Sequence, residues 1–293
     1  MSFVLGDNRY GKAETHLVRI TKGGDSGSVH EIKDVTVSIA LSGDFAASHL
    51  EGDNARVVPT DTQKNTVFAF AKEAPVGEIE EFGLRLARHF ACDFDSVEKA
   101  RVVLEEQPWH RVTIDGRPHP HSFEQRTSER RLAVVTCTRD QSWVVSGIPE
   151  LVVLKSTGSE FWGFPRDRYT TLQETHDRVL ATRVTARWRH QRAEADWARS
   201  FAQARARLVE TFASLHSLAL QQTLYAMGEA VLKDDPNIVE IRLSMRNMHH
   251  FVVDLSPFQL PNENEVFYAA DRPYGLIEGT VQREGMAPAD SAW

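Results

Sequence analysis

The sequence predicts an α+β protein made of two antiparallel sheet units, each with its strands and helices in the order ββααββ. Strand-like alternation of apolar residues opens the chain, helical periodicity follows, the alternation returns, and the whole order then occurs a second time. Because this order joins neighbouring strands by hairpins rather than by βαβ crossovers, we expect each sheet to be antiparallel and to carry its helix pair on one face. The boundary falls near residue 141, which gives a first domain over residues 1–141 and a second over residues 142–293.

The first unit starts with a predicted hairpin, in which apolar residues alternate on both sides of a glycine-rich turn. Two helices follow the hairpin. Thr60 and Gln63 have the spacing of a capping box at the start of the first helix, and Ile79, Phe82 and Leu86 recur at helical intervals in the second. The expected strands and helices cover residues 17–20, 35–41, 59–74, 78–90, 97–104 and 132–138.

The second unit repeats this order. One apolar stripe runs from Trp197 to Leu215 and another from Leu220 to Val231, each with the period of a helix. The expected strands and helices cover residues 142–156, 178–190, 197–215, 220–231, 239–245 and 249–255. Sheets of this kind leave unpaired edges, so we expect several subunits to assemble into a closed barrel.

Composition and charge narrow the class of protein. Of the 293 residues, 41% are apolar and 26% are charged, which is typical of a soluble globular protein. The net charge is −7, so neither nucleic acid nor an anionic membrane is an expected partner. No apolar run approaches the roughly 20 residues of a membrane span, and we expect a cytoplasmic protein. The two cysteines, Cys92 and Cys137, indicate a reducing compartment and are expected to be buried.

The sequence motifs of several enzyme classes are missing. The chain has no glycine-rich dinucleotide motif after a strand, no P-loop, no nucleophile elbow and no HExxH zinc motif. His119 and His121 form an HxH pair, but residues 116–124 contain no accompanying carboxylate motif, so we interpret this segment as a solvated loop rather than a metal site. We therefore expect neither a metal nor a cofactor.

Several longer segments together carry a more specific signal. They are YGKAE at residues 10–14, PTDTQKNT at residues 59–66, LKSTGSEFWGFPRDRYTTLQETHDR at residues 154–178, SLALQQTLY at residues 217–225 and RNMHHF at residues 246–251. With these motifs the chain resembles the cofactor-independent urate oxidase (uricase) family over almost its whole length. The resemblance implies a tandem T-fold subunit and a homotetramer with a tunnel through stacked barrels, whose active sites are shared between two subunits. It also implies that urate, dioxygen and water react to give 5-hydroxyisourate and hydrogen peroxide, without a cofactor.

The same resemblance implies the residues of the site, position by position. The family's purine-binding residues fall on Phe161, Leu172, Arg178, Leu220 and Gln221, together with Thr60 and Asp61 from the neighbouring subunit. Its proton-handling residues fall on Lys12, Thr60 and His249, and Asn247 falls where the family binds dioxygen.

The residue types at the purine-binding positions suit a flat, electron-rich anion. Arg178 can donate two parallel hydrogen bonds to one edge of urate, and the amide of Gln221 offers a donor and an acceptor to the opposite edge. Phe161 supplies a ring face, and stacking on such a plane contributes roughly 1–3 kcal/mol. Taken alone, Arg178 has a plainer interpretation as a surface residue and Phe161 as a core residue.

The remaining positions suit proton transfer and dioxygen chemistry. Without a cofactor the substrate must itself be the reductant, so the protein has to remove protons from urate. Lys12 can do this through Thr60, with His249 orienting the relay, and Asn247 can donate to an oxygen species above the purine plane. Because a Thr60 hydroxyl that caps its helix is not free for this relay, we expect one of the next two residues to take the cap. Taken alone, Lys12 is a solvated strand lysine and Asn247 ends a strand.

Three residues depart from the family pattern. Arg246 and Met248 stand beside Asn247 where the family usually has proline and lysine, and Arg9 stands where a neutral glutamine is common, adding a cation near Lys12. Two other functions stay open at this point. One is a T-fold enzyme for a pterin or a related purine that uses zinc or a differently placed glutamate, and the other is a purine-binding assembly that has lost catalysis.

Overall fold

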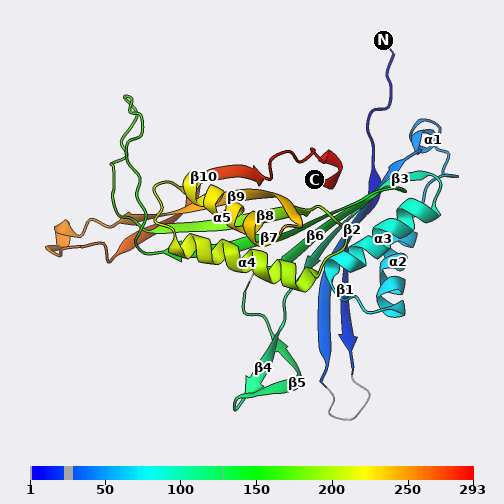
Figure 1. Cartoon of the computed structure of the whole chain (residues 1–293), viewed down its shortest axis with the longest axis horizontal. Coiled ribbons are helices and arrows are strands. Elements are labelled where there is room, and N and C mark those ends of the chain that lie inside the picture. Colours follow the sequence, from blue (N-terminus) through cyan, green and yellow to red (C-terminus); the bar gives the residue numbers. More distant parts are fainter. Residues whose placement is uncertain (1, 23–28, 128) are drawn as a thin grey trace. The chain divides into compact units, whose positions relative to one another are not determined.

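The computed structural model describes residues 2–22, 29–127 and 129–293, and in this part of the chain it confirms the α+β class (Figure 1). The strands are β1 (Tyr10–Thr21), β2 (Glu31–Gly43), β3 (Val97–Glu106), β4 (His110–Ile114), β5 (Arg117–Glu124), β6 (Arg131–Cys137), β7 (Ser142–Lys155), β8 (Leu180–His190), β9 (Ile238–Val252) and β10 (Phe267–Gln282). The helices are α1 (Ala46–Leu50), α2 (Thr60–Glu73), α3 (Ile79–Asp93), α4 (Trp197–Ser214) and α5 (Leu220–Asp234), and 3-10 turns lie at Ser256–Phe258 and Asp290–Ala292.

The two predicted sheets are joined into one, with the strand order β1-β2-β3-β6-β7-β8-β9-β10, while β4 and β5 form a separate hairpin. The joining pair is β6 and β7, which run antiparallel from Leu132 opposite Gly147 to Cys137 opposite Ser142. The predicted domain boundary at residue 141 lies in the turn between them and stays a prediction. The chain divides into two compact units, the first made of Met1–Gly147, Arg189–Ala198 and Ala287–Trp293, and the second of Ile148–Trp188 and Arg199–Met286.

The core of the first unit lies between its helices and one face of its strands. The apolar positions predicted on α3, among them Ile79, Phe82 and Leu86, are all fully buried. Burial of each such side chain contributes about 1.5–3 kcal/mol to folding. Gly83 allows α3 to approach the sheet closely, since a Cβ at this position would lie 2.7 Å from Cδ1 of Leu104 on β3. The pairing of the two predicted hairpin strands and both predicted helices of this unit are confirmed, while the predicted glycine-rich turn between those strands lies outside the described residues.

The core of the second unit is formed by α4 and α5 together with its strands. Leu208 and Phe212 of α4 and Met227 of α5 are buried in one cluster with Trp188 of β8. Both predicted helices are therefore confirmed. Trp197 is an exception within the first stripe, because the first turn of α4 belongs to the first unit and this side chain packs in that unit's core.

Several predicted elements differ from the structure. β9 is one continuous strand where the sequence predicted two, and β10, which pairs antiparallel with it, was missed because most of its side chains are exposed. The segment 116–124, predicted to be a loop, contains β5, which pairs with β4. Cys137 is buried as expected, but Cys92 is exposed near the end of α3.

Within the described residues, no helix has the length and apolar character that a membrane-spanning segment needs.

Candidate active site

A pocket of about 500 Å³ in the second unit brings together half of the predicted site residues. Its walls are the segment between β7 and β8, the second half of β9, and Asn264 and Phe267 where the chain enters β10. The predicted residues that line it are Phe161, Leu172, Arg178, Asn247 and His249. Positions that are up to 88 residues apart in the chain (249 minus 161) thus contribute to one concave surface.

The Arg178 guanidinium and the Phe161 ring form one corner of this pocket. The Cζ atom of Arg178 lies 5.1 Å from the centroid of the Phe161 ring, within the range of a cation–π contact. Nε of Arg178 donates to Oγ of Ser159 at 3.3 Å, and its two Nη atoms donate to no residue that the structure describes. Burial lowers the pKa of Arg178, yet a guanidinium stays charged at neutral pH. The corner therefore presents a fixed positive fork next to an aromatic face.

The backbone holds Phe161 in place. The Phe161 N–H donates to the carbonyl oxygen of Thr175 at 2.8 Å, and the Thr175 N–H donates back at 3.0 Å. The ring is stacked on that of Phe164, with the centroids 5.1 Å apart. These contacts fix the ring that a planar ligand would stack on.

Asn247 and His249 lie two residues apart in the middle of β9. Asn247 is opposite Gly275 and His249 opposite Ala270 of β10, so the plain interpretation of Asn247 as a strand end is wrong. Side chains two apart on a strand point to the same face. Neither side chain hydrogen-bonds to another residue in the described ranges, and both line the pocket, so both are available to a ligand.

The unusual residues beside Asn247 do not break the strand. Arg246 donates to the Glu150 carboxylate at 2.6 Å and lies over the ring of Tyr274, and Arg183 donates to the same carboxylate. Glu150 thereby offsets part of the charge of Arg246, which does not line the pocket. Met248 also contributes to the lining of the pocket.

The start of α5 carries two further predicted residues, which do not line the pocket. Leu220 is the first residue of α5 and its side chain is buried in the core, so only its backbone can reach a ligand. Gln221 is exposed, and its side chain makes no hydrogen bond within the described part of the chain. The amide of Gln222 is already engaged, because its Oε1 accepts from the Leu218 N–H at 2.8 Å. Of the two glutamines, Gln221 is therefore the one with a free amide.

Lys12, Thr60 and Asp61 lie in the first unit, where β1 meets the start of α2. Lys12 is opposite Ile39, and the strand register shifts directly after it at a β-bulge. Gly11 is required beside it, since a Cβ would lie 1.8 Å from the Ile39 carbonyl oxygen. The hydroxyl of Tyr10 anchors the segment before α2, as it accepts from the Val58 N–H at 2.7 Å and donates to the Val58 carbonyl at 3.1 Å.

The electrostatics of this region centre on Asp61. Its carboxylate accepts from Nζ of Lys64 at 2.5 Å and from Nδ2 of Asn65 at 2.8 Å. These contacts, with Lys64 the largest and Lys12 a small further contribution, hold the pKa of Asp61 below its usual range. The charge of Lys12 thus contributes to the electrostatic field at the start of α2.

The expected capping of α2 is wrong. The N-cap is Pro59, whose side chain has no hydrogen-bonding group, and neither of the two residues after Thr60 takes the N-cap position. Gln63 does not complete a capping box either, because it is buried and its Nε2 donates to the Val58 carbonyl at 3.2 Å. The Thr60 hydroxyl is exposed and does not cap the helix, so the predicted conflict between capping and proton transfer does not arise.

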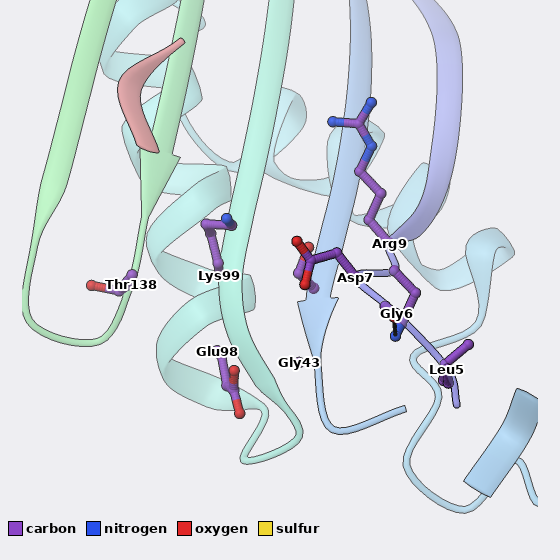
Figure 2. Close-up of a pocket in the computed structure, with 10 residues that line it drawn as sticks. Leu5, Gly6, Asp7, Arg9, Gly43, Glu98, Lys99 and Thr138 are labelled. Carbon is purple, nitrogen blue, oxygen red and sulfur yellow. Dashed lines mark hydrogen bonds between the residues drawn. The ribbon is translucent and has the colours of Figure 1, made fainter. Parts of the chain in front are cut away.

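A larger hollow of about 820 Å³ in the first unit contains none of the predicted site residues (Figure 2). Both signs of charge line it, with Arg9 and Lys99 near Asp7 and Glu98. Arg9 thus lies at this hollow, which Lys12 does not line. The smaller pocket of the second unit is the better candidate, because it combines aromatic faces with one desolvated cation.

In the described residues, no group of three or more His, Cys, Asp and Glu side chains is placed to hold a metal ion. His119 and His121 lie side by side, with ring centroids 4.5 Å apart, but they have no such third partner.

Comparisons with known proteins give a consistent family. The model of the family described as Uricase matches residues 8–136 and 144–278. A uricase of Arthrobacter globiformis is 53% identical over 99% of this chain and 93% of its own length, and a uricase of Dictyostelium discoideum is 40% identical over 95% and 97%. The crystal structure of the Arthrobacter globiformis uricase superposes with a TM-score of 0.93 over 99% of this chain and 98% of that one. The chain therefore belongs to the uricase family.

Proposed function

We propose that the chain oxidises urate with dioxygen and water to 5-hydroxyisourate and hydrogen peroxide, with no metal or organic cofactor. The observation that carries the proposal is the corner formed by Arg178 and Phe161, a charged planar fork next to an aromatic face inside one pocket. Urate is flat and anionic at neutral pH, with oxygen acceptors along its edges. Its ring stacks on Phe161, while the two free Nη atoms of Arg178 donate to one edge.

A neighbouring subunit completes the site in this proposal. Phe161, Arg178 and Asn247 of one subunit hold the purine and dioxygen, and Thr60 and Asp61 of the neighbour contact the purine. Lys12 comes with them, because Tyr10 and Val58 tie its strand to the start of α2. The proposed assembly is the homotetramer with a tunnel that the family resemblance implies. The cytoplasmic location stays a prediction of the sequence.

The chemistry follows from the need to make urate a reductant. Lys12 takes a proton from bound urate through the Thr60 hydroxyl, and His249 orients this relay. The more electron-rich anion then gives two electrons to dioxygen, which leaves as hydrogen peroxide after protonation, while water adds to the oxidised purine at C5. Asn247 donates to the oxygen species, a role that suits an amide because it does not titrate.

An oxygen electrode and an absorbance trace test the function directly. We expect the purified protein to bleach the near-ultraviolet band of urate, to consume dioxygen and to release peroxide, with rates unchanged by a chelator. Tight urate binding without oxygen uptake would instead indicate a purine-binding assembly. Loss of activity on chelation would indicate a metal-dependent T-fold enzyme.

Replacement of Arg178 tests whether its guanidinium binds one edge of urate. We expect Arg178→Gln to raise the KM for urate by about 10- to 100-fold and to change kcat little, because a charged hydrogen bond contributes about 1.5–3 kcal/mol and acts on bound substrate throughout. Arg187→Gln is the matched control, since Arg187 is exposed on β8 and lines no part of the pocket. Steady-state kinetics of the two variants measure this effect, and an unchanged KM for urate in Arg178→Gln would contradict the proposed role of Arg178.

A further inference from the structure

The carboxylate of Glu160, next to the stacking residue, is held by three N–H donors. It accepts from Nε2 of His216 at 2.5 Å, from Nε1 of Trp162 at 2.7 Å and from Nδ1 of His176 at 3.3 Å. Its side chain is only 17% exposed. None of these four residues lines the pocket, and the proposed reaction gives none of them a role.

The donors come from two segments of the chain, the one between β7 and β8 and the one before α5. Glu160 and Trp162 flank Phe161 directly in the chain. His216 lies four residues before Leu220, where α5 begins (220 minus 216). The backbone reinforces this connection, because the Glu160 N–H donates to the Ser217 carbonyl at 2.7 Å. A single carboxylate therefore joins the segment that carries the stacking ring to the segment that leads to the proposed amide contact of Gln221.

We propose that Glu160 is a positioning residue, which fixes the Phe161 ring relative to the start of α5 and so sets the affinity for the flat purine. This inference rests on the proposed function. Glu160 does not touch the substrate, and it acts through Phe161 on one side and through the α5 segment on the other.

The charge of Glu160 matters as well as its shape. An ionised carboxylate only accepts hydrogen bonds, so its two oxygens satisfy three converging donors. A carboxamide would turn one of those oxygens into an N–H₂ group that faces a donor. The bond from His216, followed by those from Trp162 and His176, lowers the pKa of Glu160 to about 2, so the carboxylate is ionised wherever the enzyme is assayed.

The test compares Glu160→Ala and Glu160→Gln with the wild-type full-length protein. We expect Glu160→Ala to raise the KM for urate, and the Kd for the non-oxidised purine xanthine, by about tenfold, with kcat within about twofold, because stacking contributes equally to bound substrate and transition state. Glu160→Gln keeps part of the network and should show a smaller rise. Trp162→Phe, which removes one N–H donor and keeps an aromatic ring, should raise KM by about two- to threefold and serves as the readout if Glu160→Ala does not fold.

The control variant is Asp93→Ala, which removes a comparable histidine–carboxylate pair on α3, where Oδ2 of Asp93 lies 2.7 Å from Nδ1 of His89. It should leave both constants unchanged. A lower kcat at an unchanged KM in the Glu160 variants, or no change in either constant, overturns the proposal. In both cases Glu160 would have no effect on the affinity for the purine. Failure of the wild type to oxidise urate is a separate result that overturns the proposed function, and the xanthine Kd still tests the positioning role.

Discussion

Lys12→Met should lower turnover of urate by about 10²- to 10⁴-fold, the usual contribution of a positioned general base. Methionine has nearly the length of lysine but cannot accept a proton from Thr60. Lys12 lies at a β-bulge in β1 and beside the start of α2, and it is not part of the purine pocket. The affinity for xanthine should therefore change by no more than a few-fold, so the loss falls on kcat.

Stopped-flow absorbance and a xanthine titration measure the two quantities. Lys72→Met is the matched control, because Lys72 is exposed in the last turn of α2 and forms no contact with the proposed site. Turnover of Lys12→Met within tenfold of wild type would show that another group takes the proton. Equal losses in turnover and affinity would place Lys12 in substrate binding instead.

Arg131→Met should cost about 3–5 kcal/mol of unfolding free energy at neutral pH, because it leaves a buried carboxylate without its cation. Glu80, in the first turn of α3, is fully buried, and Nη2 of Arg131 donates to its Oε2 at 2.7 Å. Arg131 also pairs with Glu78, and Oγ of Ser146 donates to the other oxygen of Glu80 at 2.6 Å. The loss of function in this variant would be a loss of folded protein.

The pH dependence of that loss has a defined sign. Burial raises the pKa of Glu80 more than the opposing attraction of Arg131 lowers it. Removal of Arg131 raises this pKa further, so in the variant the carboxyl is protonated as the pH falls towards its raised value, and the uncompensated charge disappears. The stability deficit of Arg131→Met should accordingly grow as the pH rises through this raised pKa and should shrink in acid.

Denaturant unfolding of the wild type and of three variants checks this account. The double variant Arg131→Met with Glu80→Gln should regain most of the lost stability, because neither residue then leaves a buried charge. Arg139→Met should cost less than about 1 kcal/mol, since its 3.0 Å ion pair with Asp95 is exposed. A deficit in Arg131→Met below 1 kcal/mol, or one that does not change with pH, would mean that Glu80 is protonated or solvated in the native protein.

Local patterns predicted the fold where one face of an element is buried. The α3 positions and the α4 and α5 stripes have strong apolar periodicity because the core fixes it. β10 has no such pattern, since most of its side chains are exposed. The polar sequence Arg246–His249 suggested a break in β9, yet β10 supplies the backbone partners that keep this strand continuous. The HxH segment lies in β5 because a neighbouring strand, rather than its own sequence, provides its hydrogen bonds.

The candidate site was predicted from family motifs and not from local patterns. Phe161, Leu172, Arg178, Asn247 and His249 come together in one pocket, which no spacing in the chain reveals. Residues that hold the site were missed. Tyr10 anchors the start of α2 through the backbone of a residue 48 positions away, and Glu160 bonds to a histidine 56 positions away, so neither has a sequence signal. The spacing of Gln63 from Thr60 predicted a capping box, but the Gln63 side chain is buried and donates to the Val58 carbonyl instead.

Co-expression of Lys12→Met and Arg178→Gln chains tests most directly whether the urate site joins the Arg178 pocket of one subunit to Lys12 of another. With random mixing, about a quarter of the sites in the mixed tetramers would combine an intact Lys12 with an intact Arg178. At low urate concentration the mixture should therefore reach about a quarter of wild-type activity, above the roughly one tenth or less that Arg178→Gln retains and far above Lys12→Met. If each site lay within a single chain, every site would carry one of the two substitutions, and the mixture would be no more active than the parent variants.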